Sequence, residues 1–437
     1  MLHYHFIGLK GIGMSALAQY YQNQGIKITG SDAAAGGHSG ENITSDIDRV
    51  IYSAAIPENN CELKKARCLK ISCLSYAQAL GELTKKYFTI AVSGMHGKST
   101  TASLIALIAT RAGLNPTVIV GTKIKEFDFS NFRLGGKPSF SGLKISSRLK
   151  SEIFQKQLLI IEADEYKASF LNYWPRILVL LNLEREHLDY YKDLRQIKKT
   201  FGQYIGHLGM DDYLIVNRDN SYLVELAEKY NCGRTIFFNP SRKILGSHFQ
   251  IPGRHILADA QAALAVANVL GIPRKISRAA LNDFRGVWRR FDFRRKINGA
   301  NVFDDYGHHP TEIKATLQAA REILPKNKCL WIVFQPHQYL RTYLLFQDFV
   351  KCFDESDRLI LVPIYSVSGR ESIEIKKKVS SRELAVAVKK RWVKKFPQKK
   401  VFYFSLSQVS SFLKKNLKSG DVCLLMGAGD IYSRVKF

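Results

Sequence analysis

The stretch that decides the fold reads Ala91-Val92-Ser93-Gly94-Met95-His96-Gly97-Lys98-Ser99-Thr100. It completes an apolar run, Phe88 to Val92, that predicts a buried strand, and it leads into a helical segment, Ala102 to Thr110. Glycines in such a turn let backbone N–H groups surround phosphate oxygens, and the helix start adds partial positive charge. Lysine at this place can reach the β- and γ-phosphates, and serine can bind Mg²⁺. The strand–turn–helix context therefore predicts a phosphate-binding loop, although Gly-Lys-Ser alone fits an ordinary glycine turn equally well.

Strand-like and helical segments alternate along the whole chain, which predicts an α/β fold with mainly parallel sheets. The 437 residues are enough for about three domains of ~150 residues each. We expect three blocks, residues 1–87, 88–293 and 294–437. Their predicted strands are 4–7, 26–28 and 49–52 in the first block, 158–161 and 177–181 in the second, and 301–303, 330–334, 358–362 and 422–426 in the third.

Composition is typical of a soluble globular enzyme and not of a disordered chain. Hydrophobic residues make up 46% and charged residues 24% of the chain. No apolar run approaches the ~18 residues of a membrane helix, and the start of the chain lacks the basic head of a secretory signal. We therefore expect a cytoplasmic protein without membrane insertion. The seven cysteines are scattered and form no Cys-x-x-Cys pair, so we expect reduced thiols, mostly buried, and neither zinc sites nor disulfides.

The net charge of +27 raises the question of polyanionic partners, either nucleotides or nucleic acid. The basic residues are spread along the chain, with the densest groups at 376–378 and 389–400. They are not interleaved with aromatic residues as in RNA-binding segments. We prefer to interpret the charge as a solvated cationic surface, and we expect no specific nucleic-acid partner.

The first glycine turn, Gly8 to Ser15, follows the first predicted strand. Its glycines at 8, 11 and 13 do not match the spacing Gly-x-Gly-x-x-Gly, so it is a poor dinucleotide fingerprint. It suits a loop that binds some diphosphate at a helix start. Asp32, after the second strand, is either a hydrogen-bond acceptor for a ribose or uracil group or an ordinary turn aspartate.

Acidic and histidine residues follow two strands of the second block. Residues 162–165 are Glu-Ala-Asp-Glu, directly after strand 158–161, and His187 lies in the segment 182–189 after strand 177–181. Each alone fits a solvated loop or a structural histidine. We expect the two strand ends to be neighbours facing the phosphate loop, and this favours a Mg²⁺ site, because Mg²⁺ prefers such oxygen ligands near phosphates.

The third block has polar strand-to-helix turns of its own. Residues 304–312 read Asp-Asp-Tyr-Gly-His-His-Pro-Thr-Glu, and residues 335–342 repeat the arrangement one strand later. Paired histidines and aspartates pack poorly but handle anions and protons well. Residues 289–292, Arg-Arg-Phe-Asp, either supply a guanidinium that faces phosphate or form a basic linker.

Together these segments resemble the Mur ligase family, over almost the whole chain. The segments 304–312 and 335–342 are the most specific, and Tyr306 favours the members that add L-alanine over the tripeptide-recycling members, which usually have Phe there. The resemblance rests on residues 8–15, 94–100, 162–165, 182–189, 252–255, 289–292, 304–312, 335–342 and 427–431.

The resemblance implies a Rossmann-like UDP-sugar domain (1–87), a central P-loop ATPase domain (88–293) and a Rossmann-like C-terminal domain that brings the amino acid (294–437). It implies an ATP- and Mg²⁺-dependent amide-forming ligase of peptidoglycan precursor synthesis, acting on UDP-N-acetylmuramate and L-alanine as a monomer or weak homodimer. The sugar carboxylate would attack the γ-phosphate to form an acyl phosphate, which the amine of L-alanine then attacks.

The family's residue roles transfer position by position. Catalytic roles would fall to Lys98, Glu162, His187, Arg290 and His308. ATP would contact Gly94, Met95, His96, Gly97, Lys98, Ser99, Thr100, Arg290 and Asp305, the last through the ribose. The UDP-sugar would contact Gly8, Gly11, Gly13, Met14, Ser15, Asp32 and Ser53. The amino acid would contact Tyr306, His308, His337 and Arg341. Ser99 and Glu162 would hold one Mg²⁺ and His187 a second.

Four positions depart from the family pattern. Met95 replaces a common threonine, Ile256 and Asp259 replace two asparagines that read the nucleotide, and Gln338 replaces an arginine. A missing amide can cost about 1–3 kcal/mol if a buried partner loses its hydrogen bond. These departures motivate one alternative, a ligase of the same fold with another amino-acid or peptide acceptor. The net charge of +27 motivates a distant second one, a basic P-loop nucleic-acid-binding protein without ligase activity.

Overall fold

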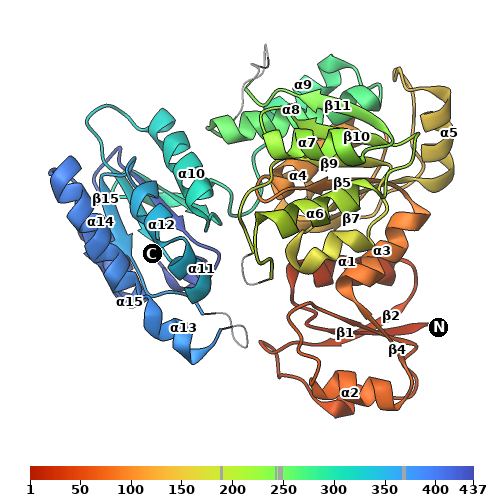
Figure 1. The fold of residues 1–437 in the computed structure, drawn as a ribbon, viewed down its shortest axis with the longest axis horizontal. Coiled ribbons are helices and arrows are strands. Elements are labelled where there is room, and N and C mark those ends of the chain that lie inside the picture. Colours follow the sequence, from red (N-terminus) through yellow and green to blue (C-terminus); the bar gives the residue numbers. More distant parts are fainter. Residues whose placement is uncertain (188–189, 242–243, 245–249, 367–370) are drawn as a thin grey trace. The chain divides into compact units, whose positions relative to one another are not determined.

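The protein is described here by a computed structural model that covers residues 1–187, 190–241, 244, 250–366 and 371–437 (Figure 1). The chain forms two compact units. The first unit consists of Met1–Glu186, Asp193–Phe249 and Leu257–Arg285, and the second of His187–Lys192, Gln250–Ile256 and Gly286–Phe437.

The first unit begins with a four-stranded parallel sheet in the order β2-β1-β3-β4. Its core holds Ile7, Val50 and Leu63, which are almost fully shielded from solvent. The carboxyl ends of β1, β2 and β3 meet at one edge, where the first glycine turn begins. The strands are β1 (His3–Ile7), β2 (Lys27–Ser31), β3 (Arg49–Tyr52) and β4 (Ser72–Ser75), and the helices are α1 (Ile12–Asn23), α2 (Cys61–Cys68) and α3 (Tyr76–Lys86), with the short η1 (Gly40–Asn42).

The same unit contains a seven-stranded sheet in the order β11-β10-β9-β5-β8-β6-β7, parallel except for β7. Its central strand β5 (Phe88–Ser93) is buried along its whole length, as expected for a strand covered on both faces. The other strands are β6 (Thr117–Ile124), β7 (Ser130–Arg133), β8 (Leu158–Glu162), β9 (Ile177–Leu180), β10 (Tyr213–Asn217) and β11 (Arg234–Phe238). The helices are α4 (Lys98–Arg111), α5 (Ser147–Lys156), α6 (Leu194–Ile205), α7 (Ser221–Tyr230), α8 (Arg254–Val269) and α9 (Arg274–Asp283), with η2 (Lys125–Phe127) and η3 (Tyr166–Asn172).

The second unit holds a six-stranded sheet in the order β12-β13-β17-β14-β15-β16, in which only β12 is antiparallel to its neighbour. The strands are β12 (Asp292–Ile297), β13 (Ala300–Asp305), β14 (Leu330–Phe334), β15 (Arg358–Leu361), β16 (Lys400–Tyr403) and β17 (Val422–Met426). The helices are α10 (Pro310–Ile323), α11 (Tyr339–Leu344), α12 (Phe346–Cys352), α13 (Ile373–Lys378), α14 (Ser381–Lys395), α15 (Leu406–Asn416) and α16 (Ile431–Arg434).

The α/β fold with three mainly parallel sheets is confirmed, and two expectations are wrong. The strands β8 and β9 are not neighbours, because β5 lies between them and pairs with both. The thiols are free, as expected, but only Cys352 and Cys423 are buried. Cys61 and Cys68 are exposed because α2 turns Leu63 and Ala66 toward the core instead. The described helices include none with the length and hydrophobicity that a membrane crossing requires.

Candidate active site

The phosphate loop, residues 94–97, connects the end of β5 to the start of α4. Gly94 and Gly97 have φ values of 137° and 84°, where side chains are strained. A Cβ at Gly97 would lie 2.3 Å from Asp259 Oδ1, so the loop also lacks space for one. Asn182, two residues beyond the end of β9, fixes the loop: its Oδ1 accepts the His96 N–H at 2.9 Å, and its Nδ2 donates to the His96 carbonyl at 3.0 Å.

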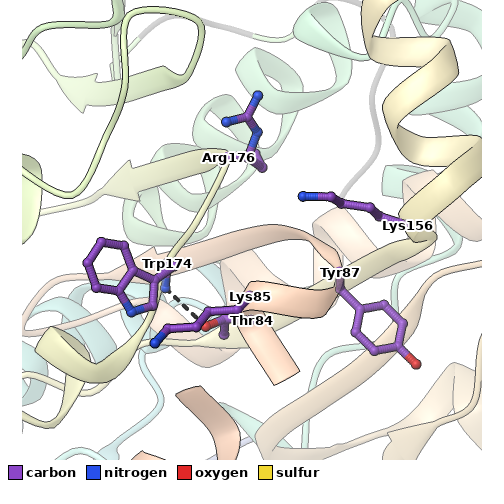
Figure 2. A pocket seen from close by; sticks show the side chains of 6 residues that line it. All are labelled: Thr84, Lys85, Tyr87, Lys156, Trp174 and Arg176. Atoms are coloured by element: carbon purple, nitrogen blue, oxygen red, sulfur yellow. Dashed lines mark hydrogen bonds between the residues drawn. The ribbon is translucent and has the colours of Figure 1, made fainter. Parts of the chain in front are cut away.

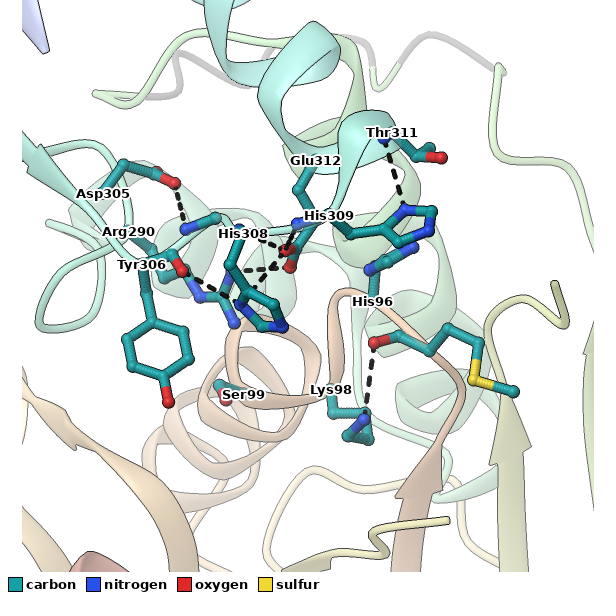
Figure 3. A network of polar contacts seen from close by, with 12 residues as sticks. His96, Lys98, Ser99, Arg290, Asp305, Tyr306, His308, His309, Thr311 and Glu312 are labelled. Atoms are coloured by element: carbon teal, nitrogen blue, oxygen red, sulfur yellow. Dashed lines mark hydrogen bonds and ion pairs between the residues drawn. The ribbon is translucent and has the colours of Figure 1, made fainter. Parts of the chain in front are cut away.

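Lys98, the first residue of α4, is held by the buried carboxylate of Glu165 (Figure 3 draws Lys98 and Ser99). Its Nζ donates to the two Glu165 oxygens at 2.9 and 3.1 Å and to the Gly94 carbonyl at 2.7 Å. Burial by itself would lower the pKa of Lys98, but the Glu165 and Asp164 carboxylates outweigh burial and raise it. The lysine is therefore a fixed cation at the loop. The sequence motifs assign Glu165 no role of its own, although it belongs to the predicted acidic cluster.

Ser99 and Glu162 come together as predicted. The Ser99 hydroxyl donates to Glu162 Oε2 at 2.9 Å, and Glu162 Oε1 accepts the Gly121 N–H of β6 at 2.7 Å. A hydroxyl and a carboxylate beside a phosphate loop form an oxygen donor set that suits Mg²⁺. The residues present therefore fit the metal that the sequence implied.

His187 belongs to the second unit, and its place in the site stays a prediction. Its backbone is left-handed, with φ 53°, and its carbonyl accepts the N–H groups of Tyr190 and Tyr191, both at 2.9 Å. Leu188 and Asp189, which end the predicted segment 182–189, lie outside the described residues.

The first glycine turn and Asp32 lie at one edge of the four-stranded sheet, where the sequence placed a diphosphate loop. The Gly8 and Leu9 N–H groups donate to the Ser31 carbonyl at 2.8 and 3.1 Å. Asp32 Oδ2 accepts the Lys10 N–H at 2.9 Å. Asp32 is therefore tied directly to the turn and is more than a distant loop residue.

The other predicted UDP-sugar residues differ in burial and in the contacts they make. Met14 is buried, so it packs in the core and does not line an open surface. A Cβ at Gly13 would lie 3.0 Å from the Tyr76 ring. The Ser15 hydroxyl donates to the Ile12 carbonyl at 3.0 Å and lies 3.1 Å from Asn131 Nδ2. Gly11 caps α1, and the Ser53 N–H donates to the Ile7 carbonyl at 3.0 Å, at the same edge.

In the second unit, the carboxylate of Asp305 accepts hydrogen bonds from the backbone around its own turn. Its oxygens accept the Phe291 N–H at 2.9 Å and the Gly307 N–H at 2.7 Å, and burial raises its pKa. Arg290 Nη1 donates to Glu312 Oε1 at 3.0 Å. The other Glu312 oxygen accepts the His308 and His309 N–H groups (Figure 3). Asp305 and Glu312 therefore order the turn that carries the predicted histidines.

The four predicted amino-acid-binding residues form one connected cluster. The ring of His308 lies 5.6 Å from that of Tyr306 and 5.9 Å from that of His337, between centroids. His337 stacks on Tyr365 at 5.4 Å. Arg341 Nη1 donates to the His337 carbonyl at 3.2 Å. The structure thus brings together a guanidinium, a phenol and two imidazoles, which suits a small zwitterion.

Each unit has a cavity lined by described residues. One, of about 340 Å³, is lined by Thr84, Lys85, Tyr87, Lys156, Trp174 and Arg176 (Figure 2). Tyr87 and Arg176 directly precede β5 and β9, so this cavity lies at the amino edge of the sheet, opposite the loop. Its Arg176 is already paired with Glu152 and Asp212. The other, about 280 Å³ in the second unit, is lined by Arg254, His255, Ala315, Gln318 and Glu322.

Three models of one protein family match successive parts of the chain. Residues 3–88 match the description "Mur ligase family, catalytic domain", residues 92–244 "Mur ligase middle domain", and residues 289–429 "Mur ligase, glutamate ligase domain". The UDP-N-acetylmuramate–L-alanine ligase of Clostridium novyi is 36% identical over 467 residues, covering 98% of this chain and 95% of that protein.

Solved structures show the same fold. The UDP-N-acetylmuramate-alanine ligase of Thermotoga maritima has a TM-score of 0.78 at 22% identity, covering 100% of this chain and 97% of that one. A murein peptide ligase of Psychrobacter arcticus has a TM-score of 0.70 at 21% identity, covering 100% and 98%.

Proposed function

This chain belongs to the Mur ligase family, and on that premise we propose that it joins L-alanine to the carboxylate of UDP-N-acetylmuramate. ATP is converted to ADP and phosphate, in peptidoglycan precursor synthesis. The observation that carries the proposal is the convergence of Lys98, Ser99 and Glu162 at the phosphate loop of a chain aligned over 98% of its length with ligases of that name.

In the first step the sugar carboxylate attacks the γ-phosphate, giving an acyl phosphate and ADP. Positioning and charge neutralisation supply most of the catalysis in such transfers. The Lys98 ammonium lies against the loop and would neutralise β/γ-phosphate charge. Ser99 and Glu162 would hold Mg²⁺, and His187 would hold a second ion. Bound Mg²⁺ would neutralise phosphate charge and orient the oxygens.

Asp305 has a structural part beside the ribose contact that the family pattern implies, which stays our proposal. Both its oxygens accept backbone N–H groups, so we assign it the ordering of the turn that carries Tyr306 and His308. Arg290, whose charge Glu312 and Asp305 stabilise, stays our candidate for a guanidinium that faces the nucleotide.

In the second step the amine of L-alanine attacks the acyl phosphate carbonyl and phosphate leaves. The cluster of Tyr306, His308, His337 and Arg341 would surround the amino acid, with the Arg341 guanidinium pairing with its carboxylate. The UDP group would lie at the first glycine turn beside Asp32 and Ser53. We further propose the division of labour among residues 1–87, 88–293 and 294–437, a cytoplasmic location, and a monomer or weak homodimer without a specific nucleic-acid partner.

The test is the substrate dependence of ADP formation by the purified protein. Phosphate should be released only when UDP-N-acetylmuramate, L-alanine, ATP and Mg²⁺ are all present. Release that needs neither sugar nor amino acid would discard the proposal.

A second candidate is the same chemistry with a peptide acceptor. Gln338 favours it, because Arg341 is then the only guanidinium of segment 335–342 available to the alanine carboxylate. Competition among L-alanine, L-serine, glycine and a tripeptide decides between the two, and a preference for the tripeptide would overturn the specificity proposed here.

A further inference from the structure

Glu62 is a fully buried carboxylate on α2, far along the sequence from any of the motifs. The helix begins at Cys61, and the Asn60 side chain caps it by accepting the N–H groups of Glu62 and Leu63 at 2.9 and 3.2 Å. The cap fixes the first turn of α2, so the Glu62 side chain enters the interior of the four-stranded sheet block in a defined direction. A buried carboxylate needs several hydrogen-bond donors to offset its lost hydration.

The hydrogen-bond donors that the described residues offer to its carboxylate come from the end of β2 and the first part of the connection that follows it, residues 31–42. Oε2 accepts the Ser31 hydroxyl at 2.5 Å, and Oε1 accepts the Asn42 amide at 2.6 Å and the Ser39 N–H at 3.3 Å. His38 Nδ1 lies 2.8 Å from Ser31 Oγ and 3.3 Å from Glu62 Oε2. On β1, His5 Nε2 lies 3.9 Å from Oε1. Glu62 therefore ties the end of β2 and the first part of this connection to α2.

The same connection supports the first glycine turn. The Ser31 carbonyl accepts the Gly8 and Leu9 N–H groups. The Asp32 carboxylate accepts the Lys10 N–H at 2.9 Å and the Ala34 N–H at 3.0 Å. Residues 33–36 are Ala-Ala-Ala-Gly and exposed, so they offer little packing to hold the connection in place. The β1–β2 ladder and the direct bonds of Asp32 hold it beside the turn, and the Glu62 hydrogen bonds at Ser31, Ser39 and Asn42 fix the segment on both sides of it.

We propose that Glu62 is a positioning residue for the UDP-sugar: through Ser31, Ser39 and Asn42 it sets where Asp32 and the first glycine turn meet the ligand. The inference rests on the proposed function. A positioning role differs from that of an ordinary core residue in its effect on kinetics. Removing the Glu62 carboxylate should raise the KM for the sugar and leave the KM values for the other substrates unchanged.

The chain offers a graded set of variants. Glu62→Gln keeps an acceptor oxygen for Ser39 and Asn42, and its amide can donate to Ser31 Oγ, so it should behave like the wild type. Glu62→Leu has a similar size and removes every acceptor. Asn42→Ala removes one hydrogen bond at an exposed residue and leaves the core intact. Glu82→Gln is the matched control, because Glu82 lies in the same block and its ion pair with Arg49 is partly exposed.

Steady-state kinetics with each substrate varied in turn, together with calorimetric binding of UDP-N-acetylmuramate, test the proposal. We expect Glu62→Leu to raise the KM for the sugar by about tenfold or more and to leave kcat and the KM values for ATP and L-alanine near wild type. Asn42→Ala should raise the sugar KM by about threefold, and Glu62→Gln and Glu82→Gln should leave it unchanged.

An unchanged sugar KM in Glu62→Leu, or an equal loss for all three substrates, would overturn the proposal. If Glu62→Leu does not fold, Asn42→Ala decides, and a wild-type sugar KM in that variant would overturn it as well. A wild-type protein that forms no ADP in a sugar-dependent manner would instead refute the proposed function. Calorimetric binding of the sugar by the wild type and by Asn42→Ala then still tests the role of Glu62.

Discussion

Replacing Glu165 by glutamine should lower the stability of the nucleotide-free protein and raise its affinity for nucleotide. Glu165 is 0% exposed and pairs with Lys98, whose side chain is 16% exposed, at 2.9 Å. In the free protein this carboxylate is the nearest counter-charge of the lysine. In the nucleotide complex, phosphate oxygens would supply negative charge to the same ammonium. The substitution should therefore harm the free state more than the complex.

The size of the effect follows from the burial of the pair. Removing one partner of a buried ion pair costs about 3–5 kcal/mol. Glutamine keeps one hydrogen bond, and Lys98 keeps its bond to the Gly94 carbonyl, so we expect a loss of about 2 kcal/mol. For a unit of this size that lowers the melting temperature by about 4–8 °C. If bound phosphate restores most of the loss, about 1.4 kcal/mol, ADP binds about tenfold more tightly.

Two measurements test this reasoning on Glu165→Gln. Calorimetric titration with ADP and Mg²⁺ gives the affinity, and thermal unfolding with and without saturating ADP gives the stability of each state. Glu152→Gln is the matched control, because Glu152 pairs with Arg176 at 2.9 Å in the same unit but near the amino edge of the sheet. Its stability loss should be the same with and without ADP. Weaker or unchanged ADP binding by Glu165→Gln would refute the competition between this carboxylate and phosphate.

Four further outcomes can be measured. Asp259→Asn removes a 7%-exposed carboxylate beside Gly97, so ADP should bind about three- to tenfold more tightly by calorimetry, and unchanged affinity would contradict this. Ser99→Ala should raise the Mg²⁺ concentration for half-maximal activity by about tenfold without changing sugar binding. Arg341→Lys should raise the KM for L-alanine by about tenfold, and an equal rise for ATP would count against its role. Burial lowers the pKa of His255 to about 4, so the unfolded chain binds a proton between pH 6.5 and 4 that the folded second unit does not. The free energy of unfolding of the second unit, measured in urea, should therefore fall as the pH falls through that range. His255→Gln should make this free energy depend less steeply on pH.

The buried strands could be predicted because their sequences are apolar along their whole length. Residues 330–334 and 422–426 are found as strands at the predicted positions. The prediction ended β8 and β13 too early, because Glu162 and the pair Asp304–Asp305 look like loop residues but continue the ladders. It missed β12 altogether, since residues 292–297 form an edge strand with three basic side chains. Strand order was beyond reach, because nothing local to β8 or β9 specifies that β5 lies between them.

The candidate site also has one part that the sequence predicts and another that only the fold reveals. The turn around Lys98 and Ser99 has a spacing that follows from phosphate chemistry, so sequence alone reveals it. Glu162 ends β8 and Glu165 lies three residues further along, and only the fold shows that their roles differ. Glu162 reaches Ser99 and the Gly121 N–H, whereas Glu165 is fully buried against Lys98.

A carboxylate in a sequence reads as a solvated charge, because most are exposed. A buried one is recognised only when its donors are seen, and those donors come from distant segments: β2 and the connection after it for Glu62, and the start of α4 for Glu165. Each burial costs free energy that hydrogen bonds and counter-charges must offset. A fold keeps such a group where the position of its partners matters, and in both cases the partners adjoin the loops where we place the two nucleotides.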